Sequence, residues 1–341
     1  MIGDVLTTSI LFEVLRKKFP DAKLHYLINS HTFPVVENNP FIDKMIYFSP
    51  EIEKSYLKFY SFLKEIRKER YDVVIDVYGK LSSNLVTLLS GAENRIGYHK
   101  KYSSKIFNQP IKRISTSTKN VSLAVENRLR LLQPLDIEFE YVEPKIYLKE
   151  QEIDSARKML EANSIDLSNP IFMISVLGSD EKKTYPPEYM AQLLDIIVEQ
   201  KPDAQLLFNY IPKQEQQARD IFNITSAKTK KQIFFDIYGK SLREFLAITA
   251  HCNAVIGNEG GAINMAKALN KPTFIIFSPH IGKGNWYGNM ESKKHIAVHL
   301  SDYTSHTQKN IKAAQSNPLQ YYQKLTPDLI SPTLIKYLAN I

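Results

Sequence analysis

The sequence has little cysteine and no long hydrophobic run. Its 341 residues include one cysteine, Cys252, so an internal disulfide is excluded and a reducing compartment is expected. No apolar run approaches the ~20 residues of a membrane span, and the first thirty residues lack a signal-peptide pattern. We therefore expect a cytoplasmic protein, or one that touches a membrane only from the side.

Several motifs of common enzyme classes are also absent. There is no G-x-G-x-x-G fingerprint, Walker A loop, G-x-S-x-G elbow or H-E-x-x-H pair, which argues against dinucleotide redox chemistry, P-loop hydrolysis and zinc proteolysis. No D-x-D occurs, so the carboxylate pair with which many sugar transferases hold a divalent ion is missing. His295 and His299 are four residues apart, but their segment alternates like a strand and does not predict metal ligands. We expect no metal or other cofactor.

The composition is that of a globular protein with a modest basic excess. The chain is 43% hydrophobic and 23% charged, carries a formal charge of +8, and is long enough for two domains of ~150 residues each. Residues 94–119 contain no acidic residue. A solvated loop is the common explanation of such a run, and the alternative is a surface for the phosphate groups of nucleic acid, lipid or sugar. The seven basic residues of this stretch are Arg95, Lys100, Lys101, Lys105, Lys112, Arg113 and Lys119.

Apolar patterns along the chain predict an α/β protein, because segments of strand and helix periodicity alternate twice. The predicted strands cover residues 23–28, 44–48, 72–77, 95–98, 171–176, 204–208, 233–236, 254–256 and 273–277. The predicted helices cover residues 4–19, 51–70, 81–89, 187–199, 214–222, 242–250 and 262–269. The two series predict two Rossmann-like domains that face each other, with the cleft between them as the default ligand site.

These patterns also suggest the domain boundaries. We place the first domain at residues 1–147 and the second at residues 148–325, and assign residues 326–341 to a C-terminal helix that packs back on the first domain. The chain opens directly on a helix at residues 1–4, whereas a doubly wound domain normally begins with a strand. A permuted topology would explain this, but the simpler expectation is a missing first strand of about ten residues. An in-frame stop codon just upstream would contradict that expectation.

The most informative motif is a glycine turn between an apolar strand and a helix. It reads Gly257-Asn258-Glu259-Gly260-Gly261, and the helix follows from Ala262. Glycines let a ligand approach the backbone, and the N–H groups and dipole at a helix N-terminus favour an anion such as diphosphate. Glu259 would repel an anion, so a ribose or sugar hydroxyl suits it better. A tight turn without a ligand is the alternative.

Two further motifs follow the same logic. Gly178, Ser179 and Lys183 come after the strand that opens the second domain, so they are expected in the same cleft, where Lys183 could neutralise phosphate charge. A surface turn is the alternative. Asp4 lies at the N-terminus of the first predicted helix. It could cap that helix, as aspartate often does, or face the cleft as a general base.

Taken together, these segments resemble glycosyltransferase family nine, the ADP-heptose:lipopolysaccharide heptosyltransferase family, over nearly the whole chain. The similar blocks follow the family's order. They are residues 2–8, 72–83, 95–98, 125–132, 178–186, 258–272 and 275–279, with Trp286 after them.

The resemblance implies a GT-B fold, a nucleotide-diphospho-sugar donor similar to ADP-heptose, and inversion at the anomeric carbon without a metal. Asp4 matches the family's base, and Lys183 matches the lysine that stabilises the departing diphosphate. Glu215 is similar to a carboxylate that holds the nucleoside, in an alignment loose by one residue. The resemblance thus implies a donor site that comprises Gly178, Ser179, Glu215, Asn258, Glu259, Gly260, Gly261, Ala262 and Asn264.

The chain departs from the family pattern at two donor positions. Where the family has Asp-Thr-Gly-x-x-His, this chain has Glu259 at the first position and Asn264 at the last. Asn264 cannot bring the charge of a protonated histidine, and Glu259 reaches one methylene further, so the donor could be another nucleotide sugar.

The basic stretch at residues 94–119 lies in the domain that the resemblance assigns to the acceptor. A phosphorylated glycolipid at the inner leaflet, or another glycan, would suit it. A nucleotide-sugar epimerase or hydrolase and a non-catalytic carbohydrate-binding protein remain as alternative functions. Nucleic acid is not expected as a partner, because the basic residues lack interleaved aromatics.

Overall fold

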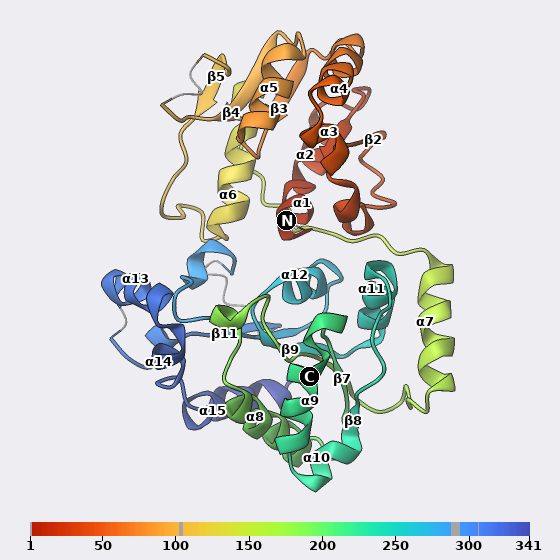
Figure 1. Cartoon of the computed structure of the whole chain (residues 1–341), viewed down its shortest axis with the longest axis vertical. Coiled ribbons are helices and arrows are strands. Elements are labelled where there is room, and N and C mark those ends of the chain that lie inside the picture. The colour runs from red at the N-terminus through yellow and green to blue at the C-terminus, as the bar shows by residue number, and fades with distance from the viewer. Residues whose placement is uncertain (1, 102–104, 288–293, 306) are drawn as a thin grey trace. The chain divides into compact units, whose positions relative to one another are not determined.

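The computed structural model describes residues 2–101, 105–287, 294–305 and 307–341 (Figure 1). It consists of two compact units, Met1–Pro144 and Lys145–Ile341. The boundary lies three residues before the predicted one at residue 147. Strands and helices alternate along both units, so the predicted α/β class is confirmed.

The first unit contains two separate pieces of parallel sheet. One pairs β1 with β2, and the other has the order β3-β4-β5. In chain order the elements of the unit are α1 (Ile2–Thr8), α2 (Ile10–Lys18), β1 (His25–Ile28), the 3₁₀ helix η1 (Ser30–Val35), β2 (Lys44–Tyr47), α3 (Pro50–Lys54), α4 (Tyr56–Lys68), β3 (Val73–Asp76), α5 (Leu81–Leu89), β4 (Asn94–Tyr98), β5 (Gln109–Ile111), α6 (Leu123–Leu129) and η2 (Arg130–Leu135).

Two helices predicted as continuous are each divided in the first unit. The helix expected at residues 4–19 breaks at Ser9, whose hydroxyl donates to the carbonyl of Leu6 at 2.7 Å and so competes with the backbone pattern. The helix expected at residues 51–70 is divided into α3 and α4 by Ser55. The side chain of Ser55 caps α4 by accepting a hydrogen bond from the N–H of Lys58.

The second unit is built on one six-stranded parallel sheet with the order β11-β10-β9-β6-β7-β8. Its elements are α7 (Glu150–Ala162), β6 (Ile171–Ser175), η3 (Glu181–Lys183), α8 (Pro187–Gln200), β7 (Gln205–Phe208), η4 (Pro212–Gln214), α9 (Glu215–Ile224), α10 (Ala227–Gln232), β8 (Ile233–Phe234), α11 (Leu242–His251), β9 (Ala254–Asn258), α12 (Gly261–Ala268), β10 (Thr273–Ile276), η5 (Lys283–Asn285), β11 (His295–Val298), η6 (Leu300–Asp302), α13 (Gln308–Ser316), α14 (Pro318–Tyr322) and α15 (Pro327–Leu338).

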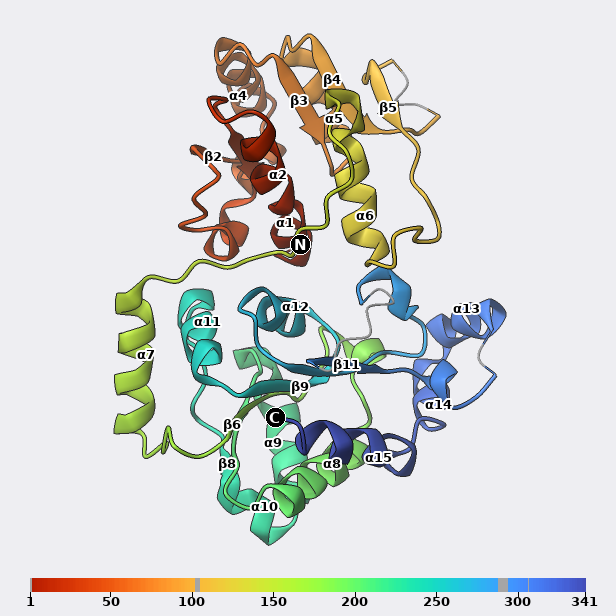
Figure 2. The same cartoon turned by 180° about the vertical axis from the view of Figure 1, so that it is seen from behind.

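Helices cover both faces of this sheet. α8 and α15 lie on one face, and α11 and α12 lie on the other (Figures 1 and 2). Every residue of β6, β7, β9 and β10 is buried, which explains why their sequences read as continuous apolar runs. The chain enters the sheet at β6 in its middle and changes direction between β6 and β9. This is the doubly wound order, in which ligands bind at the change of direction.

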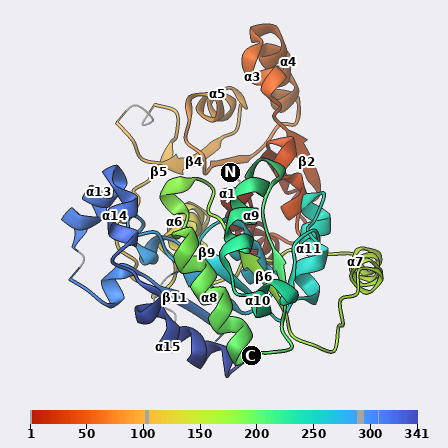
Figure 3. The same ribbon diagram turned by 60° about the horizontal axis from the view of Figure 1, so that its bottom comes forward.

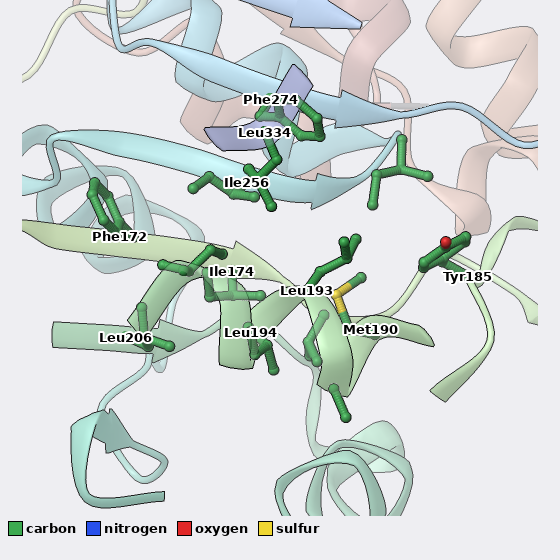
Figure 4. Packing of buried hydrophobic residues seen from close by; sticks show 14 of the residues in the cluster. Phe172, Ile174, Tyr185, Met190, Leu193, Leu194, Leu206, Ile256, Phe274 and Leu334 are labelled. Atoms are coloured by element: carbon green, nitrogen blue, oxygen red, sulfur yellow. The ribbon is translucent and has the colours of Figure 1, made fainter. Parts of the chain in front are cut away.

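The core of the second unit lies between the sheet and α8, and it includes the C-terminal helix. Figure 4 shows Ile174 of β6 beside Leu194 of α8, and Leu334 of α15 beside Phe274 of β10. The prediction that residues 326–341 pack back on the first domain is wrong, because α15 packs on α8 and buries its apolar stripe in this core. The spacing of that stripe predicted a buried face but carried no information about its partner.

Among the described residues, no helix combines the length and the apolar character that a membrane span requires.

Candidate active site

The candidate site lies where β6 and β9 end side by side. The two strands pair in parallel, with Ser175 opposite Gly257, so the loops that follow them leave the same edge of the sheet. One loop runs from Val176 to Tyr185, and the other is the short turn that leads into α12. Both predicted donor motifs of the second unit are therefore brought together at the change of direction of the sheet.

Asn258 joins these two loops. Its side chain is fully buried, and its Nδ2 donates to the carbonyl oxygens of Ser175 at 2.9 Å and Val176 at 3.0 Å. Its Oδ1 accepts a hydrogen bond of 2.7 Å from the N–H of Tyr185. Three hydrogen bonds thus hold the amide inside the protein. Asn258 was predicted as a residue of the donor site, and the structure shows that its side-chain amide positions the two loops.

Gly178 closes the first loop on itself. An added Cβ would lie 2.3 Å from the carbonyl oxygen of Lys183, so a side chain does not fit here. Its N–H donates to Oγ1 of Thr184, and its carbonyl accepts from Nε2 of Gln214. These bonds occupy both backbone groups of Gly178, which therefore shapes the loop. The next residue, Ser179, is exposed, and its hydroxyl donates to Asp180 at 3.2 Å.

Lys183 and Glu259 form an ion pair at the site. Their Nζ and Oε1 atoms are 3.4 Å apart, and Glu259 is 7% exposed whereas the Lys183 side chain is 30% exposed. Burial raises the pKa of the Glu259 carboxyl, and the charge of Lys183 opposes that rise. Oε1 of Glu259 has no hydrogen bond of good geometry, so the lysine is its main electrostatic partner. The pair places one positive and one negative charge close to the N-terminus of α12.

The N-terminus of α12 is open. Gly260 is its N-cap residue and provides no side-chain cap, and the N–H of Asn264 makes the first bond of the helix, to the carbonyl of Gly260. The N–H groups before Asn264 therefore have no partner within the helix. A Cβ on Gly260 would meet nothing within 4 Å. Ala262 is buried and Asn264 half-buried. This uncapped end, beside a lysine, is suited to bind an anion.

Two further residues of the site follow β10: Ser278, which lies in the similar block 275–279 but was given no role of its own, and His280, which was not predicted from the sequence. The hydroxyl of Ser278 donates to the carbonyl of Lys182 at 2.8 Å and lies 2.7 Å from Nδ1 of His280. Burial, followed by the charge of Lys183, lowers the pKa of His280 and favours its neutral form. β10 pairs with β9, so its carboxyl end reaches the same edge of the sheet. Because the strand at residues 273–277 was predicted, its position beside the strand before the glycine turn was the signal that could have placed Ser278 and His280 in the site.

Glu215 lies at the start of α9, beyond the adjacent strand β7. It is exposed, and its Oε1 accepts a hydrogen bond of 3.1 Å from Arg219. Arg219 in turn lies over the ring of Phe235, 4.1 Å from its centroid. The preceding residue, Gln214, is the one that contacts the first site loop, through the carbonyl of Gly178.

In the first unit, Asp4 is held by an arginine of α6. Nη2 of Arg128 donates to Oδ1 of Asp4 at 2.9 Å, and Nε donates to Oγ1 of Thr8 at 2.9 Å. The third guanidinium nitrogen donates to the carbonyl of Ala124. Arg128 is 8% exposed, whereas the Asp4 side chain is 35% exposed. The arrangement presents an oriented, accessible carboxylate in the first turn of α1.

The predicted anion patch divides into structural and exposed residues. Arg95 donates to the carbonyls of Ile106 and Ala92, so its guanidinium holds the chain around β4. Lys100 donates to the carbonyl of Gly79 at 2.7 Å. Arg113 is exposed and lies 3.9 Å above the ring of Tyr98. The lysines of the patch that are exposed are Lys101, Lys105 and Lys112.

Comparison with known proteins identifies relatives of the chain. The sequence model of glycosyltransferase family 9 (heptosyltransferase) matches residues 59–315. The chain is 23% identical over 286 residues to lipopolysaccharide heptosyltransferase 1 of Campylobacter coli, and the match covers 81% of each protein.

Solved structures share the fold. The crystal structure of a family 9 glycosyl transferase from Veillonella parvula matches with a TM-score of 0.79 at 17% identity, over 100% of this chain and 95% of that one. The structure of Escherichia coli ADP-heptose lps heptosyltransferase II matches with a TM-score of 0.73 at 17% identity, over 99% and 96%. The predicted GT-B fold class is confirmed by these likenesses.

Proposed function

The chain belongs to glycosyltransferase family 9, the heptosyltransferases, and from this premise we propose that it transfers a heptose from ADP-heptose to a lipopolysaccharide-type acceptor. It is a glycosyltransferase by family, which sets aside an epimerase, a hydrolase and a non-catalytic binding protein. The donor is taken from the relatives, since the E. coli protein is named for ADP-heptose. The observation that carries the proposal is the lysine beside the uncapped N-terminus of α12.

The second unit supplies the donor site in this proposal. The N–H groups at the start of α12 bind the diphosphate, and Lys183 neutralises the charge that grows on the leaving group. Gly260 and Gly261 leave the space that the diphosphate requires. Because these groups provide the electrostatic stabilisation, the transfer does not require a metal ion. Glu215 is assigned to the nucleoside, and Asn264 takes the position from which the family's histidine faces a phosphate.

The first unit supplies the base. The acceptor oxygen attacks the anomeric carbon while its proton passes to the Asp4 carboxylate, and the bond from that carbon to the diphosphate oxygen breaks. A single displacement of this kind inverts the anomeric configuration. Arg128 is a positioning residue, because it orients Asp4 through a 2.9 Å hydrogen bond.

The acceptor is proposed to be a phosphorylated glycolipid at the inner face of the cytoplasmic membrane. Exposed basic side chains after β4 and β5, namely Lys101, Lys112 and Arg113, offer charges that match phosphate groups. This assignment gives the acid-free stretch at residues 94–119 a partner of opposite sign.

The test is transfer of heptose to a lipopolysaccharide acceptor that lacks it, measured as ADP release together with product mass. Asp4→Asn should lower kcat by a factor of about 100 or more, because the amide cannot take the proton. ADP binding should be unchanged, since Asp4 belongs to the first unit. Asp154→Asn, an exposed aspartate on α7, is the matched control and should be as active as the parent.

Three outcomes would overturn parts of the proposal. Turnover of the Asp4→Asn variant at the parent rate would remove Asp4 from the mechanism. Loss of activity in a metal chelator would contradict metal independence. Retention of the anomeric configuration in the product, read from its proton NMR couplings, would contradict the single displacement.

A further inference from the structure

The outward face of α4 carries aromatic, apolar and basic side chains that the proposed reaction does not use. Tyr56, Leu57 and Tyr60 are 95%, 83% and 59% exposed. At 100° per residue, Lys64, Arg67 and Lys68 share an arc of about 120° with these three. The one acidic residue of α4 lies outside that arc. We call these six residues the α4 face.

The exposure of the α4 face does not result from a loosely packed helix. On the opposite side of α4, Phe59 and Phe62 contact Phe48 with ring centroids 6.0 and 5.5 Å apart, and Ile66 is 5% exposed. The buried aromatic side of α4 therefore holds the helix in place, while the apolar side chains of the α4 face are exposed to solvent. Figure 3 shows α3 and α4 projecting from the rest of their unit.

The neighbouring helix of the same unit repeats the pattern. Leu81, Leu88 and Leu89 of α5 are 77%, 41% and 40% exposed. α5 packs beside α4. Single exposed apolar residues are ordinary on a protein surface, but two packed helices that each expose several apolar side chains are not.

From these observations we propose that the α4 face docks on the surface of an anionic lipid bilayer. Tyrosine rings favour the level of the lipid headgroups, where their apolar body and hydroxyl are both satisfied. Leu57 would enter the boundary with the acyl chains, as in amphipathic interfacial helices. The charges of Lys64, Arg67 and Lys68 complement anionic headgroups. The ammonium of Lys64 already lies 4.5 Å from the centroid of the Tyr60 ring, so the two side chains present one combined surface.

The inference deepens the proposed function, since a glycolipid acceptor would lie in the same bilayer, but it depends on the α4 face alone. Membrane docking by the α4 face can therefore be disproved without disproving the proposed transfer reaction. A protein partner is the other class of occupant, and the experiment separates the two.

The experiment measures binding of the full chain to vesicles without any acceptor. Vesicles with 30% phosphatidylglycerol in phosphatidylethanolamine (about one anionic lipid in three) are compared with pure phosphatidylcholine by co-sedimentation. The test variant is Leu57→Glu. Leu57 is the second residue of α4, where an acidic side chain favours the helix dipole, so the variant should fold. The matched control is Leu319→Glu, at the second position of α14 in the other unit and 56% exposed.

The parent should bind the anionic vesicles and not phosphatidylcholine, and Leu57→Glu should weaken that binding about tenfold or more. Leu319→Glu should bind like the parent. Transfer to a water-soluble acceptor fragment should be the same in all three, which keeps the readout of the α4 face apart from the chemistry. A double variant, Lys64→Gln with Lys68→Gln, should lose the preference for anionic lipid by about tenfold without adding an acidic group.

Two results would overturn the proposal. One is binding of Leu57→Glu to anionic vesicles as tightly as the parent. The other is a parent that binds no vesicles but forms an oligomer in light scattering that Leu57→Glu dissociates, which would assign the α4 face to a protein partner.

Discussion

Replacing Glu259 with glutamine should tighten the binding of ADP. The Glu259 carboxylate is nearly buried, and its Oε1 lies 3.4 Å from Nζ of Lys183, the cation assigned to the diphosphate. It therefore engages that cation and also places a negative charge directly before the N-terminus of α12. The amide of glutamine has nearly the same size and no charge, so the substitution frees Lys183 and removes repulsion of the incoming phosphates.

The magnitude follows from the distance. Unit charges 3.4 Å apart attract by about 5 kcal/mol at an effective dielectric constant of about 20. The net value is much smaller, because Lys183 keeps 30% of its side chain in solvent and both ions give up hydration to form the pair. A net effect of about 1–2 kcal/mol corresponds to an increase in ADP affinity of about 5- to 30-fold.

Protonation of Glu259 should have the same effect as the substitution. Burial raises the pKa of this carboxyl, so the parent protein should gain affinity for ADP, relative to the variant, as the pH falls through that raised pKa. The two dissociation constants should therefore converge at low pH and separate at high pH. Protonation of ADP itself affects both proteins equally and leaves their ratio unchanged.

The assay is titration calorimetry with ADP from about pH 5 to about pH 8, on the parent, Glu259→Gln and the control Glu161→Gln, an exposed residue of α7. The control should match the parent at every pH. Equal or weaker binding of ADP to Glu259→Gln at high pH would refute the reasoning. It would identify Glu259 as an acceptor for a ribose hydroxyl and not as a competitor of the phosphates.

Three further substitutions test the frame around the site. Asn258→Ala removes three buried hydrogen bonds and should lower the free energy of unfolding by about 3 kcal/mol in urea titrations; an unchanged midpoint would contradict the positioning role. Gly178→Ala places a Cβ 2.3 Å from the carbonyl oxygen of Lys183 and should weaken ADP binding about tenfold. In the control Gly282→Ala the added Cβ has no atom within 4 Å, so this variant should bind ADP like the parent. Burial lowers the pKa of His295 to about 4, so the folded state favours the neutral form and the free energy of unfolding should fall as the pH drops from about 6.5 towards 4. His295→Asn should reduce that loss by about 2 kcal/mol. Identical pH profiles of unfolding for the parent and the variant would exclude His295 as the cause.

The buried strands were the most predictable part of the fold. β6 was predicted at residues 171–176 and runs from Ile171 to Ser175, because a strand covered on both faces must be apolar throughout. Helix ends were less predictable, since the break at Ser9 depends on one hydroxyl bond to a local carbonyl. The partner of α15 could not be predicted either, because an apolar stripe specifies burial without specifying the surface that covers it.

The candidate site shows the same division. The glycine turn before α12 and Lys183 were found from residue type and position, because the ends of parallel strands meet at one edge. The function of Asn258 could not be found, since it depends on the direction of a buried amide that the sequence does not encode locally. The contact of Ser278 with the first site loop joins residues 96 positions apart and depends on the order of the strands in the sheet.

The three bonds of Asn258 have a consequence for the exchange of parts between relatives. They hold the loop after β6 and the turn after β9 in a fixed position relative to each other, although about eighty residues separate the two in the chain. A chimera that takes only one of these segments from another family member would break the hydrogen bonds of the amide. The segment that was not exchanged would then no longer be held in its position. Donor preference should therefore transfer between such enzymes only when both segments, together with Asn258, are grafted as a pair.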